Sequence, residues 1–162
     1  MTTLATSLAA PTGLAATAGD GLVALSWNVV TNAAYYEVFR SLTNGGPYTQ
    51  IAAVTATNST DAGLVNGTMY YYVVKAANGV GMSGNSAQVS ARPVSMTPPT
   101  SSAVLVGNQL QLSWPADHTG WRLQMSTNLS AANWQDVSGA DATNQISIPP
   151  TNANAFFRLV YP

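Results

Sequence analysis

The chain has 162 residues, of which 7% are charged, and its formal net charge is −1. With 5 Lys and Arg residues against 6 Asp and Glu, the sequence lacks the basic stripe that nucleic acids and anionic membranes require. Cysteine is absent, which excludes disulfides and thiolate metal sites, and no apolar run reaches the ~18 residues of a membrane span. We therefore expect neither a nucleic-acid partner nor a membrane span.

An internal repeat divides the chain. The stretch Leu25–Trp27 returns as Leu112–Trp114, and apolar residues recur 9, 11, 43, 45 and 47 positions after each Trp. Apolar residues spaced by two are typical of half-buried strands. The repeat therefore predicts an all-β fold with two tandem immunoglobulin-like β-sandwiches, the second shortened and lacking a final strand.

In the first unit, short strands alternate with turn signals. Residues 1–10 are predicted to be a linker or a loose extra strand, and Pro11 opens the domain. Closely spaced turns, such as Asn44–Pro47 and Asn66–Gly67, favour a sandwich over helices. The predicted strands, after a first one near Leu14, are Gly21–Trp27, Tyr35–Arg40, Tyr48–Val54, Tyr70–Ala77 and Ser86–Ala91, with Asn58–Asp61 as a short strand or a bend.

Residues 11–92 resemble a fibronectin type III domain. The resemblance rests on Pro11, Leu14, Trp27, the run Tyr36–Ser41, the turn Gly45–Tyr48 and the segment Leu64–Tyr70. Tyr70 would be the family's tyrosine-corner residue. In secreted bacterial glycoside hydrolases and other surface proteins this domain acts as a spacer, and the resemblance implies that role here.

A Pro-rich linker, residues 93–100, leads to a small C-terminal module, residues 101–162. Its predicted strands are Ala103–Val106, Gln109–Trp114, Trp121–Met125, Trp134–Val137, Gln145–Ile148 and Phe156–Tyr161. Residues 112–124 and 156–162 resemble a module that ends large exported proteins of Verrucomicrobia-like bacteria. The resemblance implies an extracellular or cell-surface location in a bacterium, with Pro162 as the natural C-terminus.

The first ten residues do not form a usable signal peptide, because they contain no Lys or Arg and only a broken apolar run. We therefore expect an export signal upstream of this sequence. Upstream domains of the same parent protein are then expected partners.

A catalytic or metal site is not predicted. The one histidine, His118, lies beside Asp117, the one glutamate is Glu37, and the aspartates are scattered over turns and edges. Catalysis needs paired acids, a nucleophile with its base, or a metal cluster. We therefore expect no enzyme activity, no metal and no cofactor, with His118 held in a turn by Asp117 or by the backbone.

The tryptophans decide whether the chain can bind a polysaccharide. Trp27 and Trp114 occupy the core position of the second strand in each repeat. Trp121 and Trp134 are the candidates for stacking on sugar rings, with packing in the core as the alternative reading. Together with neighbouring polar side chains, the candidate glycan site is Trp121, Trp134, Asp117, His118 and Arg122.

Strand parity also predicts outward-facing residues on two strands that should pair. Tyr35, Phe39 and Tyr71 would form an aromatic patch in the first unit, of the kind that marks a contact site. Ordinary cross-strand pairing is the alternative. The equivalent face of the second unit holds Arg122, Gln124, Phe156 and Arg158. The predicted surface contact patch is Tyr35, Phe39, Tyr71 and Arg158.

The last strand, Phe156–Tyr161, has no successor in the sequence to cover its edge. Free edges invite pairing. Three segments could fill the position: Ala103–Val106 of the same unit, a strand from the first unit, or Thr2–Leu8 of a neighbouring molecule.

Taken together, these features of the sequence predict a non-catalytic accessory region, a spacer plus a carbohydrate- or surface-binding module. The alternative is a structural or sorting module that self-associates through the edge of Phe156–Tyr161.

Overall fold

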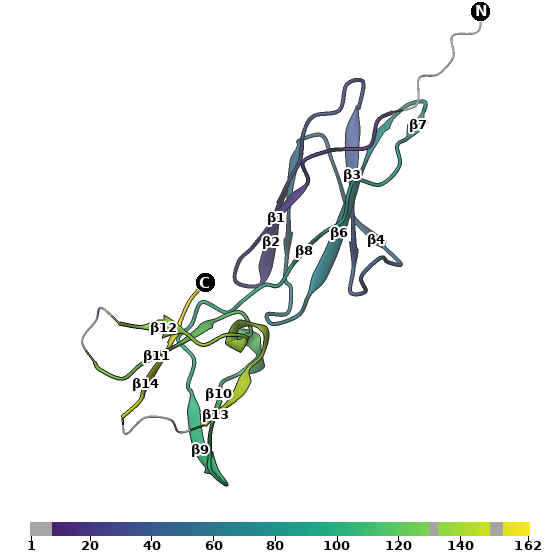
Figure 1. Ribbon diagram of the computed structural model, residues 1–162. Helices are drawn as coiled ribbons and strands as arrows, with labels where there is room; N and C mark the ends of the chain where they lie inside the picture. The colour runs from purple at the N-terminus through teal and green to yellow at the C-terminus, as the bar shows by residue number, and fades with distance from the viewer. Residues whose placement is uncertain (1–7, 130–132, 150–153) are drawn as a thin grey trace, which may run out of the picture. The chain divides into compact units, whose positions relative to one another are not determined.

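The computed structural model describes residues 8–129, 133–149 and 154–162, and it divides the chain into two compact units. The first comprises Met1–Leu64 and Thr68–Pro93, and the second comprises Val65–Gly67 and Val94–Pro162. The described residues form strands, turns and two single 3₁₀ turns (Figure 1). This confirms the predicted all-β class with fibronectin- and immunoglobulin-like architecture. Across the described part of the chain, no helix is long and apolar enough to cross a membrane.

The first unit is a sandwich of two antiparallel sheets. One sheet has the order β1-β2-β5, and the other has the order β4-β3-β6-β7, with β8 also pairing β6. The strands are β1 (Ala15–Ala18), β2 (Leu22–Ser26), β3 (Tyr35–Ser41), β4 (Thr49–Val54), β5 (Asn58–Ala62), β6 (Tyr70–Asn78), β7 (Gly81–Met82) and β8 (Val89–Ala91).

Alternate residues of these strands fill the core between the two sheets. Val38 and Val74 are fully buried, and Trp27 packs edge-on against Tyr36 with ring centroids 5.5 Å apart. The predicted core position of Trp27 is thereby confirmed. Leu8 joins the same core, so the end of the segment expected to be a linker or a loose strand packs on the domain. Residues 1–7 lie outside the described residues.

A partly buried ion pair links the two sheets of the first unit. The Arg40 guanidinium on β3 lies 3.0 Å from the Asp61 carboxylate on β5, and the Tyr72 hydroxyl on β6 donates to the same carboxylate at 3.0 Å. Burial, followed by the hydrogen bond to Asp61, raises the pKa of Tyr72 far above its ordinary value. Tyr72 therefore stays neutral and serves as a fixed donor inside the sandwich.

The second unit is a smaller sandwich with sheet orders β13-β10-β9 and β12-β11-β14. Leu112, Trp114 and Leu123 are buried between the sheets, which confirms the predicted core position of Trp114. The elements are β9 (Ser102–Val106), β10 (Gln109–Ser113), η1 (Ala116–His118), β11 (Arg122–Ser126), β12 (Gln135–Asp136), η2 (Ala140–Ala142), β13 (Gln145–Ile148) and β14 (Phe156–Val160).

Both sheets of the second unit end in strands with a free edge. β14 pairs β11 alone among the described residues, as predicted for Phe156–Tyr161. The expectation that Ala103–Val106 could fill this edge is wrong, because β9 pairs β10 in the other sheet. Part of the expected linker 93–100 belongs to this unit, since Val94 and Ser95 are buried.

Candidate functional site

The exposed side of the sheet β12-β11-β14 brings together one aromatic and four polar side chains. Gln124 on β11 lies opposite Asp136 on β12 and opposite Arg158 on β14. Because strand residues alternate between faces, Arg122 and Trp134 share this side of the sheet. We call this surface the Trp134 face, and its members are Arg122, Gln124, Trp134, Asp136 and Arg158.

A continuous hydrogen-bond chain orders the polar members of the Trp134 face. The Arg122 guanidinium donates to one carboxylate oxygen of Asp136 at 3.1 Å, and the Gln124 amide donates to the other at 2.8 Å. The Gln124 carbonyl accepts from Arg158 Nε at 2.8 Å. Gln124 is thus held from both ends, which fixes the orientation of its amide.

The chain ends on the tryptophan. The guanidinium carbon of Arg158 lies 4.3 Å from the centroid of the Trp134 ring, a stacked cation–π contact. Trp134 is half-buried, while Arg158 is exposed. The stacking and the bond to Gln124 hold Arg158 in one place on an otherwise solvated surface. The face therefore offers an ordered aromatic and cationic group to a ligand.

Asp136 remains ionised on this face. The hydrogen bond from Gln124 is the largest cause that holds the pKa of Asp136 below its ordinary value; desolvation opposes it, and the bond and charge of Arg122 add to the lowering. Arg122 and Asp136 are both exposed and compensate each other in charge. Arg158 has no carboxylate within ion-pair distance among the described residues.

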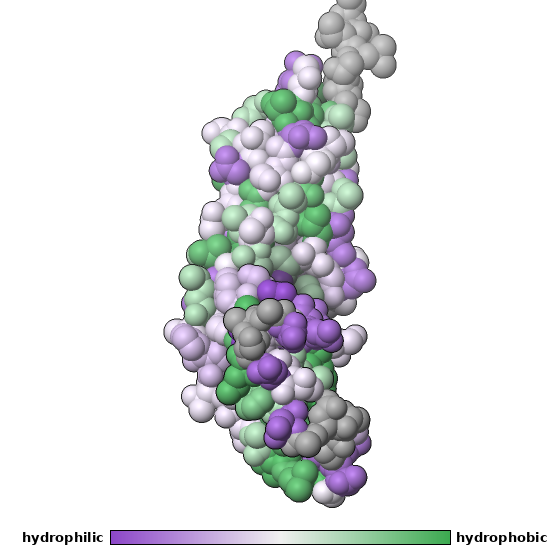
Figure 2. All heavy atoms as spheres, turned by 60° about the vertical axis from the view of Figure 1, so that its left-hand side comes forward, coloured by the Kyte–Doolittle hydropathy of each residue, from purple (hydrophilic) through white to green (hydrophobic). Residues whose placement is uncertain are grey.

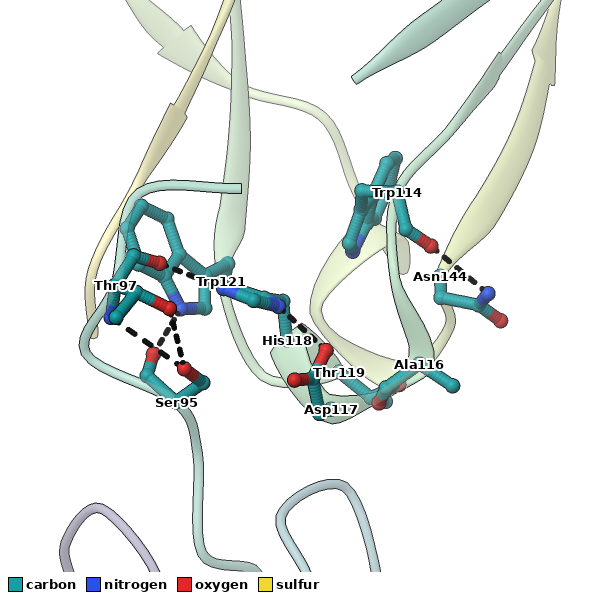
Figure 3. A network of polar contacts seen from close by, with 9 residues as sticks. All are labelled: Ser95, Thr97, Trp114, Ala116, Asp117, His118, Thr119, Trp121 and Asn144. Atoms are coloured by element: carbon teal, nitrogen blue, oxygen red, sulfur yellow. Dashed lines mark hydrogen bonds and ion pairs between the residues drawn. The ribbon is translucent and has the colours of Figure 1, made fainter. Parts of the chain in front are cut away.

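The other predicted ligand residues form a separate cluster, in which Trp121 and His118 are buried and Asp117 is exposed (Figure 3). The Trp121 side chain is 6% exposed, and its indole N–H donates to the Ser95 carbonyl at 2.8 Å. Its ring also contacts those of His118 and Tyr161. Trp121 cannot offer a ring face to a sugar, because its surroundings already occupy it. We therefore correct its assignment from stacking residue to framework residue.

His118 is likewise a framework residue. Its ring is buried, with Nε2 2.6 Å from the Thr97 carbonyl and Nδ1 2.6 Å from the Asp117 carboxylate. A carbonyl only accepts, so Nε2 carries the proton in that bond. This matches the expected turn role of His118, held by both Asp117 and the backbone. Trp121, His118 and Asp117 do not lie on the Trp134 face. Of the five residues predicted to form the glycan site, only Trp134 and Arg122 lie there.

No family model matches the chain. A poly(3-hydroxybutyrate) depolymerase of Ralstonia pickettii is 49% identical over 84 residues, 51% of this chain. An amylopullulanase of Thermoanaerobacter thermohydrosulfuricus is 43% identical over 84 residues. The chain spans 16% and 6% of these curated relatives.

A solved Fn3-like protein of Clostridium thermocellum is similar in sequence and in structure. It is 39% identical with a TM-score of 0.50, and the match covers 99% of that protein and 57% of this chain. The chain belongs to the fibronectin type III family. The resemblance drawn from residues 11–92 is thus supported, and these similarities fit an accessory domain of a larger protein. The likeness of the second unit to a C-terminal Verrucomicrobia-type module stays a prediction.

The Fn3 domain carries the predicted aromatic patch in a looser form than expected. β3 and β6 pair, and Tyr35, Phe39 and Tyr71 are half-buried on one face of their sheet. Phe39 lies opposite Val73, which is two residues from Tyr71 on the same strand. Glu37, paired with Lys75, lies between Phe39 and Tyr35 on β3. Arg158, predicted to belong to this contact patch, lies on the Trp134 face of the second unit. The contact role of the three aromatic residues stays a prediction.

The predicted site does not include Asp136, although parity places Gln124 on the same face as Arg158. Asp136 lies two positions after Trp134, so strand parity would have placed both on one side. The described residues contain no group of three or more His, Cys, Asp or Glu side chains that could hold a metal ion.

Proposed function

We propose that this chain is a non-catalytic accessory region of a larger, exported bacterial protein, located outside the cell or at its surface. The Fn3 domain is the spacer, and the second unit binds a polysaccharide through the Trp134 face. The observation that carries the proposal is the ordered Trp134–Arg158–Gln124–Asp136 chain on an exposed sheet. The similarity to amylopullulanases supports it, because those enzymes are named for polysaccharide substrates.

The physical basis is an aromatic surface beside aligned polar groups. Trp134 supplies apolar ring surface for the C–H side of a sugar, and its neighbours supply hydrogen bonds to the polar groups around it. Because the polar groups already hold one another in place, binding costs little additional side-chain ordering. The face therefore meets the requirements of a small polysaccharide site without a deep pocket.

Replacing Trp134 tests this proposal. We expect Trp134→Ala to weaken polysaccharide retention by about tenfold or more, since truncating a central Trp costs about 2 kcal/mol or more in binding. Retention is measured by affinity gel electrophoresis on a panel of polysaccharides, with urea unfolding to verify the fold. Tyr48→Ala is the matched control, because Tyr48 is a half-buried aromatic residue of the Fn3 domain outside the predicted contact patch. The proposal fails if folded Trp134→Ala is retained as strongly as the wild type, or if the control loses retention to the same extent as Trp134→Ala.

A second candidate function is assembly through the free edges of the second unit. Every residue of β9 is exposed, with Val104, Leu105 and Val106 at 52%, 68% and 55%. Figure 2 shows strongly hydrophobic residues at the bottom of the view, in the part of the second unit where Figure 1 places β9. No charged residue lies between Arg92 and Asp117 to discourage strand pairing. The edges of β9 and β14 could each accept a strand from another copy.

The molar mass in solution tests this second candidate. Under it we expect light scattering to give a mass above the 16.8 kDa monomer that increases with concentration. Leu105→Lys should restore the monomer if β9 is the edge used, and Val160→Lys should do so if it is β14, because charges on edge strands oppose pairing. A constant mass of 16.8 kDa across the series would exclude assembly in solution.

A further inference from the structure

The cationic groups of the second unit are unevenly distributed. Arg122 and Arg158 are the only Lys or Arg residues after Arg92 in the sequence, and both lie on the Trp134 face. Asp117 is bonded to His118, away from the Trp134 face. The pairing of Arg122 with Asp136 cancels one positive charge. The Trp134 face therefore carries one uncompensated positive charge, on Arg158.

Arg158 is held so that its free nitrogens are available to a ligand. Nε is bonded to Gln124, and the guanidinium carbon lies over the Trp134 ring. The terminal Nη1 and Nη2 atoms form no hydrogen bond to the described residues. A planar guanidinium presents donors in a fixed fork that matches the two oxygens of a carboxylate. Its stacking and its bond to Gln124 reduce the entropy lost when the fork engages a ligand.

The remaining hydrogen-bonding capacity of the face consists mostly of donors. Both carboxylate oxygens of Asp136 accept a bond, and the Gln124 carbonyl accepts from Arg158. The free groups are the outer N–H donors of Arg158 and Arg122 and the second N–H of Gln124. Such a surface complements a ligand group that only accepts hydrogen bonds and carries a negative charge.

We propose that the ligand of the Trp134 face is a carboxylate-bearing polysaccharide, a polymer of uronic acid. The proposal rests on the polysaccharide-binding function and names its substrate class. Arg158 binds the sugar carboxylate through its two terminal nitrogens, and the adjoining part of Trp134 contacts the C–H surface of the same ring. Gln124 is a positioning residue, because it acts on the ligand through Arg158.

A pair of polymers that differ only in charge tests this assignment. Polygalacturonate and its fully methyl-esterified form share one backbone, and esterification removes the carboxylate charge. In about 0.15 M salt, where long-range attraction is screened, we expect polygalacturonate to bind about tenfold tighter or more. Arg158→Gln should abolish this preference, and Arg158→Lys should restore it in part, because Lys keeps the charge and loses the fork.

The controls separate a specific site from general charge attraction. Lys75→Gln makes the same change in net charge on the Fn3 domain, where the ammonium lies 5.2 Å from the Phe39 ring centroid. It should leave the preference for polygalacturonate unchanged. Equal binding of the two polymers would overturn the acidic ligand and leave the polysaccharide-binding function standing. Failure to bind either of them or any other polysaccharide of the panel would overturn both proposals.

Discussion

Trp121→Ala should unfold the second unit while the Fn3 domain stays folded. Truncating a buried Trp costs about 3–5 kcal/mol, through lost contacts and the cavity that remains. Here the substitution also removes the hydrogen bond to the Ser95 carbonyl and the ring contacts with His118 and Tyr161. A unit of this small size has little stability in reserve. We therefore expect the variant to lose the urea transition of this unit.

The matched comparison for this variant is Trp134→Ala in the same unit. Trp134 is half-buried and contacts an exposed arginine, so its truncation should cost about 1 kcal/mol. Near-ultraviolet circular dichroism during urea unfolding follows both variants, with far-ultraviolet signals reporting the remaining Fn3 domain. Equal stability of Trp121→Ala and the wild type would contradict the framework role assigned to Trp121.

Asp61→Ala should destabilise the Fn3 domain by about 2–3 kcal/mol. The substitution leaves the buried Tyr72 hydroxyl without its acceptor and Arg40 without its counter-charge. Each loss lowers the free energy of unfolding, because water has little access to replace the missing partner. The figure is below that for a fully buried pair because the Arg40 side chain is 34% exposed. Urea unfolding at neutral pH measures the difference, and Tyr72→Phe, which removes the donor as well as its need for a partner, should cost less.

The same site gives the Fn3 domain a pH dependence of defined sign. The folded state raises the pKa of Tyr72 above its unfolded value of about 10. The protonated phenol therefore contributes its full stability below pH ~10, and this contribution is lost progressively as the pH rises above that value. We expect Tyr72→Phe to show a smaller loss of stability than the wild type between pH 8 and pH 11, with unfolding in urea as the readout. An equal loss in both proteins would contradict the role of the Tyr72 proton.

The sequence was sufficient to predict most of the strands, though not β7, and much of the core. Period-two spacing and the repeat around Trp27 and Trp114 depend on local geometry, which neighbouring residues determine. The burial of Trp121 could not be derived in this way. It depends on Ser95, 26 residues earlier, in a segment whose prolines suggested an extended linker. Contacts over such separations are set by packing, which periodicity does not encode.

The candidate site was predictable only in part, because alternation along a strand is local whereas the pairing between strands is not. Parity on β11 and β14 placed Arg122 and Arg158 on one face, because each strand is long enough to show alternation. The predicted strand Trp134–Val137 puts Asp136 on the same side as Trp134, but parity within one strand does not show which side chains of a neighbouring strand lie opposite it. The register of β11 with β12 and β14 then determines which polar groups meet.

Chemical-shift mapping by proton–nitrogen correlation NMR tests the central claim most directly. The labelled chain is titrated with uronic acid oligosaccharides, and the Trp134 indole N–H is followed together with the backbone amides. The account predicts saturable shifts at the Trp134 indole and along β11, β12 and β14, with the Trp121 indole unchanged. Shifts confined to the β3–β6 face of the Fn3 domain, or no shifts at millimolar ligand, would contradict it.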